Sequence, residues 1–420
     1  MLAGWSSHYD GLWTEKYMSR LPSSTLLTSS TYKIFLNKTE PHHILSLEPV
    51  VFLSSQFSTI MLPLSTALVA LLALSTRTTA APLATRQTSR QVYINNAMNA
   101  KDVLMNDWYN ASTGRFQNLW WNSANAITTL ADLVSVNPDF KNDAVTTFES
   151  TYTNAPGSNG GDWLNDYYDD EGWWALAWIK VYDITNDGKY LSTAQSIFED
   201  LLTGFTASCG GEWWDKPHTQ DNSINNELFL SIAAHLANRV PSQKSYYQDH
   251  AVDQANWFLG TKLLSENNTF HDGFSVTNNC EVEGTVWTYN QGVILGGLVE
   301  LSQATGNSSW LDPATKVAQG AVKTLVDGNG IMTETGSYPT NDNDADQFKG
   351  VLARNLATLQ AARGDSSYVD ILTKSADSIW QNDRNSDGQL GPDYQGPVYA
   401  TSAPAQSSAM DCIIAAAMVS

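Results

Sequence analysis

From Gln91 to the end of the chain, apolar side chains recur at intervals of three and four residues, a spacing typical of helices rather than strands. Gly, Asn, Asp and Pro separate the apolar segments. Several segments end at a glycine, as at Gly328 and Gly364, which favours a left-handed carboxy-terminal cap. We therefore predict twelve helices, at approximately Val92–Trp108, Ser123–Val136, Asn142–Tyr152, Asp170–Tyr182, Lys189–Phe205, Ile224–Arg239, Lys244–Leu259, Tyr289–Ala304, Trp310–Val326, Asp346–Ala362, Tyr368–Gln381 and Ser407–Val419.

No linker rich in Pro and Ser interrupts these helices, so we expect residues 91–420 to form a single all-α domain. Paired as six antiparallel hairpins, the helices would close into an (α/α)6 barrel. An open helical solenoid is the competing arrangement, but solenoid repeats resemble one another in sequence, and we find no fixed-period repeat. A closed ring places alternate loops at one end, where a cleft can form.

The first ninety residues contain a predicted secretory signal peptide at residues 61–81. Its apolar core, Leu62 to Leu74, is followed by small residues through Ala81, and it is too short to span a bilayer. Because a cleavable signal belongs at the translated start, we interpret residues 1–60 as an upstream extension from a misplaced start or as a disordered leader, with a small ordered subdomain as the alternative. Residues 82–90 are expected to be a short linker or pro-segment. We therefore expect a secreted protein without stable membrane insertion.

Three cysteines in an exported chain permit one disulfide and leave one thiol, and the sequence alone does not choose the pair. We favour Cys209 with Cys280, because both lie in Gly- and Asn-rich loop sequence, whereas Cys412 lies in an Ala- and Ile-rich segment typical of a buried helix. Three sequons that fit glycosylation in a eukaryotic secretory route occur at Asn110, Asn267 and Asn307.

Composition narrows the classes of function. The chain has 23 Lys and Arg against 43 Asp and Glu, a formal net charge of -20, and no basic run that could neutralise phosphates. We therefore exclude nucleic acid and anionic membrane surfaces as partners. The 15 Trp and 17 Tyr suggest instead a ligand that stacks on flat rings, and carbohydrate is the obvious candidate.

The segment DWLNDYYDDEGWWALAWI, residues 162–179, carries the clearest chemistry. It places Asp169 and Asp170 in the first turn of a helix, among several Trp and Tyr residues. Carboxylates at a helix start have a structural explanation, since they cap free N–H groups and complement the helix dipole. Burial beside aromatic rings can, however, raise the pKa of one carboxyl while its neighbour stays ionised, as glycosidic bond cleavage requires. Adjacent residues on a helix would hold their carboxyls about 5 to 6 Å apart, which favours retention over inversion.

Three other loops combine tryptophan with amide or acidic residues, in WWNSANA, GEWWDKP and WTYNQG. Tryptophan pairs in helical proteins usually pack in the core. If these loops share one end of the barrel, however, they would supply both stacking faces and hydrogen-bond partners for sugar hydroxyls.

In this order, YYDDEGWWALAWI, WWNSANA, GEWWDKP, WTYNQGVILGGL and FKGVLARNL resemble the motifs of glycoside hydrolase family 76, which comprises α-1,6-mannanases and related fungal cell-wall proteins. The resemblance covers about residues 91–400. It implies an (α/α)6 catalytic domain, endo-hydrolysis of α-1,6-mannan with retention and no metal, with Asp169 as the nucleophile and Asp170 as the general acid/base. The other matched positions, to which we assign substrate binding by chemistry alone, are Trp121, Asn122, Tyr168, Trp173, Trp214, Asp215, Trp287, Tyr289 and Asn290.

Two alternative functions remain open for such a site. A sugar hydroxyl in place of water would make the protein a cell-wall transglycosylase, as is thought of some fungal relatives, and loss of catalysis would leave a mannan-binding lectin. Those relatives carry a lipid-anchor signal, whereas this chain stops at Ser420 without a polar spacer and long hydrophobic tail, so we expect a freely secreted enzyme or a truncated carboxy terminus.

We expect neither a metal nor another cofactor. The segment from Asp383 to Gly388 resembles the start of a calcium loop, but position 12 is Tyr394 instead of Glu, so we interpret it as a turn between helices. The histidines show no ligand spacing. We also expect a monomer.

Overall fold

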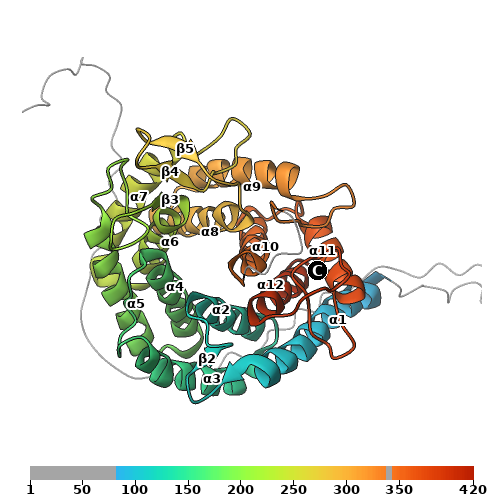
Figure 1. The fold of residues 1–420 in the computed structure, drawn as a ribbon. Coiled ribbons are helices and arrows are strands. Elements are labelled where there is room, and N and C mark those ends of the chain that lie inside the picture. Colours follow the sequence, from blue (N-terminus) through green and yellow to red (C-terminus); the bar gives the residue numbers. More distant parts are fainter. Residues whose placement is uncertain (1–81, 337–342) are drawn as a thin grey trace, which may run out of the picture. The chain divides into compact units, whose positions relative to one another are not determined.

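The computed structural model describes residues 82–336 and 343–420 (Figure 1). The predicted extension at 1–60 and the predicted signal peptide at 61–81 lie outside the described residues. Most of the described residues are helical. The α-helices are α1 (Pro82–Val103), α2 (Trp121–Val136), α3 (Lys141–Asn154), α4 (Tyr168–Thr185), α5 (Gly188–Leu201), α6 (Ser223–Arg239), α7 (Lys244–Leu259), α8 (Thr288–Thr305), α9 (Leu311–Leu325), α10 (Asn343–Arg363), α11 (Val369–Asn382) and α12 (Ala403–Val419).

The even-numbered helices form an inner ring, and the odd-numbered helices surround it (Figure 1). Each inner helix packs against the next, from α2 through α4, α6, α8 and α10 to α12. Helix α12 also packs against α2, which closes the ring. The described residues therefore confirm the predicted (α/α)6 barrel, and the contact between α12 and α2 excludes the open solenoid.

The two rings differ in how much of each helix is buried. In the outer helix α9, buried Ala314, Val317 and Ala321 recur at three- and four-residue intervals along one face. In the inner helix α12, every residue from Ala403 to Ala417 is buried, because protein surrounds the helix on all sides. The outer helix α9 therefore follows the amphipathic pattern expected from the sequence, whereas the inner helix α12 is buried on every face, polar Gln406 and Asp411 included.

Glycines allow the inner helices to approach closely. A Cβ atom at Gly292 of α8 would lie 2.8 Å from the Leu352 backbone of α10, and one at Gly350 of α10 would lie 2.6 Å from Ser408 Cα of α12. Backbone atoms cannot move aside as a flexible side chain can, so these two positions require glycine.

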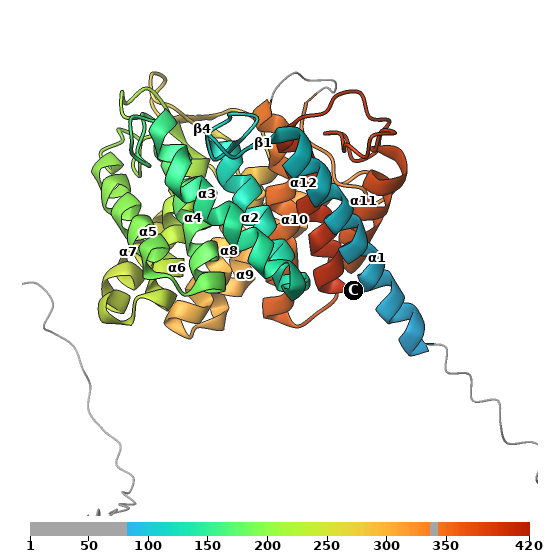
Figure 2. The ribbon, with the colours of Figure 1, turned by 90° about the horizontal axis from the view of Figure 1, so that it is seen from below.

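Short strands and single helical turns join the helices. Strands β1 (Tyr109–Asn110) and β2 (Arg115–Phe116) pair antiparallel, and β3 (Asp221–Asn222), β4 (Gly273–Ser275) and β5 (Glu281–Glu283) form an antiparallel sheet in that order. In the side view of Figure 2, β1 and β4 lie at the upper end of the barrel. The single turns are η1 (Leu104–Trp108), η2 (Pro138–Phe140), η3 (Ala155–Ser158), η4 (Leu202–Gly204), η5 (Pro241–Gln243) and η6 (Ser308–Trp310).

The favoured cysteine pairing is confirmed. Cys209, in the loop between α5 and α6, is bonded to Cys280, in the turn before β5, with their Cα atoms 5.4 Å apart. Cys412 is a buried free thiol in α12, as expected. The asparagines of all three sequons are exposed: Asn110, Asn267 and Asn307.

Some helix boundaries differ from the prediction. Helix α1 begins at Pro82, so the segment expected to be a linker or pro-segment is helical. Helix α12 begins at Ala403, four residues earlier than expected, because the Ser402 side chain accepts a hydrogen bond from the Ala405 N–H and Pro404 follows in the first turn. Within the described residues, no helix is both long and apolar enough to cross a membrane.

Candidate active site

The amino-terminal ends of five inner helices surround a cleft of about 450 Å³ at one end of the barrel. Helix amino termini carry partial positive charge, so this end of the barrel stabilises anionic groups. The cleft is lined by Leu119, Trp120, Trp121, Asn122, Tyr167, Asp169, Asp170, Trp173, Trp214, Gln220, Asn222, Tyr289, Asp344 and Phe348.

Asp169 and Asp170 lie in the first turn of α4, and both line the cleft. Tyr167, directly before the helix, has an extended backbone. Backbone hydrogen bonds join residues 166–168 to residues 214–216, which places Trp214 beside the two acids. The Asp169 carboxylate accepts hydrogen bonds from the Trp214 side chain and from the Asp170 backbone N–H.

A second set of contacts orients Asp170. The side-chain amide of Asn165 donates to Asp170 Oδ2 at 2.6 Å, and the backbone N–H of Asn165 donates to Glu171 Oε1 at 2.8 Å. Glu171 is fully buried and forms an ion pair with Lys216 at 2.7 Å. Glu171 therefore fixes the position of the residue that binds Asp170.

Both candidate catalytic carboxyls hold their protons more tightly than a carboxyl in water does. Burial, followed by the charge of Asp170, raises the pKa of Asp169 well above its usual value. Burial raises the pKa of Asp170 to about 7, opposed by the hydrogen bond from Asn165. Because each charge disfavours the other, the pair retains a proton near neutral pH.

Asp344, near the start of α10, is a third acid of the cleft that the sequence did not single out. Its carboxylate accepts a hydrogen bond from Trp121 Nε1 at 2.9 Å. Its negative charge raises the pKa of both Asp169 and Asp170. Asp344 therefore fixes one wall of the cleft and favours the protonated forms of the two acids.

Aromatic rings form two contacting pairs in the cleft, one stacked and one tilted. Trp121 stacks on Trp173 with ring centroids 5.6 Å apart, and Tyr167 contacts Trp214 at 4.8 Å. Tyr167 is 40% exposed, so its ring is open to a ligand. Five of the predicted substrate-binding residues line this cleft, namely Trp121, Asn122, Trp173, Trp214 and Tyr289.

Tyr168 and Asp215, also predicted to bind substrate, are not among the lining residues. Tyr168 is buried, and its hydroxyl lies 3.2 Å from Thr203 Oγ1. Asp215 is buried and accepts hydrogen bonds from the backbone N–H and hydroxyl of Thr219, which stabilise the turn after GEWWDKP. Their contacts are thus structural, and a direct role in binding remains a prediction.

Trp287 and Asn290 likewise lie outside the lining. Trp287 precedes α8 and packs edge-on against Phe348, with ring centroids 5.6 Å apart. Asn290 is fully buried, and its amide group lies 3.5 Å from Asp272 Oδ1. Trp287 thus contacts a lining residue without lining the cleft itself, and the assignment of both residues to substrate binding also remains a prediction.

The cleft contains residues that sequence reasoning missed. Some had a local signal: Trp120 and Tyr167 belong to quoted aromatic segments, and Phe348 begins FKGVLARNL. The others have no distinctive sequence context and reach the cleft only because the ring closes: Leu119, Gln220, Asn222 and Asp344.

The curated proteins similar to this chain are named as mannan endo-1,6-alpha-mannosidases, two of them as putative ones. Mannan endo-1,6-alpha-mannosidase DCW1 of Saccharomyces cerevisiae is 31% identical over 207 residues, 45% of this chain and 45% of that protein. This chain spans between 45% and 65% of the length of these curated relatives. Among solved structures, the GH76A alpha-1,6-mannanase from Salegentibacter sp. HEL1_6 has a TM-score of 0.70 at 23% identity, covering 78% of this chain and 100% of that one.

An inactive variant of that bacterial enzyme, in which two consecutive aspartates are replaced by alanine, has been solved in complex with alpha-1,6-mannotetrose. It has a TM-score of 0.70 at 22% identity and covers 78% of this chain and 99% of its own. The family model described as Glycosyl hydrolase family 76 matches residues 86–420, which is most of the chain. The chain belongs to glycosyl hydrolase family 76.

Proposed function

We propose that this protein is a secreted glycosidase that cleaves internal α-1,6-mannosidic linkages of mannan with retention of configuration. The observation that carries the proposal is the position of Asp169 and Asp170, which line one cleft together with two aromatic pairs and retain a proton near neutral pH. A glycosidase needs one ionised and one protonated carboxyl in such a cleft.

Asp169 is the proposed nucleophile. Burial and the charge of Asp170 raise the pKa of Asp169, but the repulsion by Asp170 is absent while Asp170 holds the proton of the pair. The ionised form of Asp169 is then favoured by the side chain of Trp214, the Asp170 backbone N–H and the positive end of α4. Its carboxylate attacks the anomeric carbon while Asp170 donates its proton to the glycosidic oxygen. The bond to the leaving sugar breaks, and a glycosyl ester forms on Asp169.

Asp170 then acts as the base of the second step. As a carboxylate, it removes a proton from water, and the water oxygen displaces Asp169 from the anomeric carbon. The released sugar keeps its anomeric configuration, and Asp170 regains its proton. Its pKa of about 7 suits a group that both gives and takes a proton near neutral pH.

The substrate class comes from the relatives. Their names specify endo-cleavage of 1,6-α-mannan, and the inactive bacterial variant was solved with an α-1,6-mannotetraose after loss of two consecutive aspartates. Asp169 and Asp170 are consecutive here as well. In the cleft, the exposed ring of Tyr167 and the Trp121–Trp173 stack would contact sugar faces, while Asn122 and Asn222 would bind hydroxyls.

Export and a monomeric state are part of the same proposal. A disulfide between Cys209 and Cys280 suits an oxidising compartment, and exposed sequons suit glycosylation on the way there. The predicted signal peptide would direct the chain to that route, so the protein would act outside the cell or in its wall.

The experiment is incubation of purified protein with linear α-1,6-mannan, followed by product analysis. Asp169→Asn and Asp170→Asn are each expected to remove hydrolysis, because each loses a reacting carboxyl. Asp166→Asn, an exposed acid three residues before the pair, is the matched control and should keep it. Full activity in either catalytic variant would refute the assignment.

The same experiment separates the alternatives. A transglycosylase would give longer products when acceptor sugars are supplied. A mannan-binding protein without catalysis would bind the polymer and release no reducing ends. Either result would overturn simple hydrolysis while leaving the location of the site intact.

A further inference from the structure

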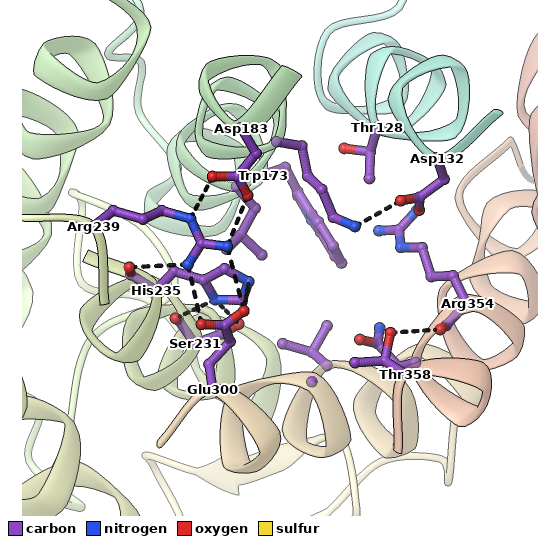
Figure 3. A pocket seen from close by; sticks show the side chains of 15 residues that line it. Thr128, Asp132, Trp173, Asp183, Ser231, His235, Arg239, Glu300, Arg354 and Thr358 are labelled. Atoms are coloured by element: carbon purple, nitrogen blue, oxygen red, sulfur yellow. Dashed lines mark hydrogen bonds and ion pairs between the residues drawn. The ribbon is translucent and has the colours of Figure 1, made fainter. Parts of the chain in front are cut away.

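Behind the cleft, the interior of the barrel holds a second cavity of about 110 Å³, shown in Figure 3. Its lining comes from the middle and carboxy-terminal parts of α2, α4, α6, α8 and α10 and includes both acidic and basic side chains. We call it the lumen cavity. Trp173 is the one described residue that lines both the lumen cavity and the cleft.

Arg354 reaches into the lumen cavity from α10, a helix that lies across the ring from Trp173. Its guanidinium donates to Asp411 of α12 at 3.0 Å and to Asn125 of α2 at 2.6 Å. The guanidinium carbon lies 6.0 Å from the centroid of the Trp173 ring, a cation–π contact. Two neighbouring helices therefore hold the cation against the ring.

These contacts continue to the surface of the cleft. Trp173 stacks on Trp121 at 5.6 Å, and Trp121 donates to Asp344 at 2.9 Å. Arg354, Trp173, Trp121 and Asp344 thus form a column that runs from the barrel interior to one wall of the cleft.

Trp173 needs support from behind because the lumen cavity leaves space on that side. Its ring is 2% exposed, and an aromatic ring next to an open cavity can move into the cavity when its neighbour is lost. We propose that Arg354 is a positioning residue, which holds the Trp173 and Trp121 rings in the orientation that binds sugar. The effect on sugar binding rests on the proposed function, whereas the effect on the rings does not.

Arg239 offers a matched comparison within the same cavity. Like Arg354, it forms an ion pair inside the barrel: it pairs with Asp183 at 2.7 Å and with Glu300 at 3.0 Å. It lies on the opposite side of the cavity from Arg354 in Figure 3 and makes no cation–π contact with Trp173 among the described residues. If Arg354 only stabilised the fold, replacing either arginine together with a carboxylate partner would affect the Trp173 ring and sugar binding equally.

The test uses protein labelled with 5-fluorotryptophan, in which a Trp173→Phe variant identifies the Trp173 fluorine resonance. The double variant Arg354→Gln/Asp411→Asn removes the cation without leaving a buried carboxylate unpaired, and Arg239→Gln/Glu300→Gln is its control. Arg354→Lys keeps the charge and loses the planar group. We expect the Arg354 variants to shift or broaden the Trp173 resonance and the control to leave it unchanged.

Kinetics on α-1,6-mannotetraose provide the second measurement. We expect the Arg354 double variant to raise KM about fivefold while kcat changes less than twofold, because stacking contributes to binding more than to bond cleavage. The control should change neither. An unchanged Trp173 resonance in the folded double variant, or equal effects in both double variants, would overturn the proposal. If the wild type cleaves no mannan, the proposed function fails, and the resonance alone decides the role of Arg354.

Discussion

Replacing Asn165 by alanine is expected to move the alkaline limit of activity to higher pH. Asp170 must be protonated to act as the acid, so activity falls as the pH rises through its pKa of about 7. The Asn165 amide stabilises the ionised form of Asp170, at a distance of 2.6 Å. Its loss therefore raises the pKa of Asp170 further, and the acid stays protonated to higher pH.

The size of the shift follows from this one hydrogen bond. A hydrogen bond to a charged group contributes about 1.5–3 kcal/mol, and about 1.4 kcal/mol corresponds to one pKa unit. Asp170 is partly exposed in the cleft, so water replaces part of the hydrogen bond lost with Asn165. The lower end of this energy range, about 1.5 kcal/mol, therefore applies. We expect the alkaline limb to move up by about one pH unit.

The assay is the pH dependence of kcat/KM on α-1,6-mannotetraose, because this ratio reports the free enzyme. Asn222→Ala is the control, since Asn222 lines the same cleft but directs its amide to Asp272 rather than to the acids. The control should leave the limb where it is in the wild type. A limb that stays fixed or moves to lower pH in Asn165→Ala would refute the reasoning.

Two further predictions concern stability. Gly350→Ala places a Cβ atom against the Ser408 backbone and should lower the free energy of unfolding, measured by urea titration, by about 1–3 kcal/mol. Gly188→Ala is the control and should not lower it, because the new Cβ meets nothing within 4 Å. Equal free energies of unfolding in the two variants would contradict the close packing of α10 and α12. Burial opposes ionisation of Glu300, but His235 and Arg239 lower the pKa of its carboxyl to about 2. The ionised carboxylate therefore stabilises the fold by about 3 kcal/mol at neutral pH, and more than half of this stabilisation is lost by about pH 3. The wild type should therefore lose its stability advantage over Glu300→Gln as the pH falls, and a constant difference would exclude this linkage.

The ring of helices could be predicted because its signal is local and repeated. Outer helices such as α9 bury one face, which leaves a three- and four-residue period in the sequence. Inner helices such as α12 lack that period because they are buried on every face, but most of the α12 residues are apolar or small. The disulfide could be predicted because Cys209 and Cys280 both lie in loop sequence, where two chain segments can meet. Cys412 lies in a buried helix and remains a free thiol.

The lining of the cleft could be predicted only in part, because side-chain direction depends on helix phase and ring closure. Tyr168 precedes the acids in the same helical turn, and adjacent side chains on a helix diverge by about 100°, so it faces Thr203 instead of the cleft. Asp344 sits near two similar acids, Asp342 and Asp346, and only the packing of the barrel brings it to Trp121. A hydrogen bond between side chains that are 223 residues apart leaves no local pattern in the sequence.

The measurement that tests the central claim most directly is the stereochemistry of hydrolysis. Proton NMR can follow the first minutes of α-1,6-mannotetraose cleavage by the wild type, before the new reducing end mutarotates. If Asp169 forms a glycosyl ester that water then displaces with help from Asp170, the α anomer appears first. Initial release of the β anomer would mean direct attack by water, and it would contradict the assignment of Asp169 as the nucleophile.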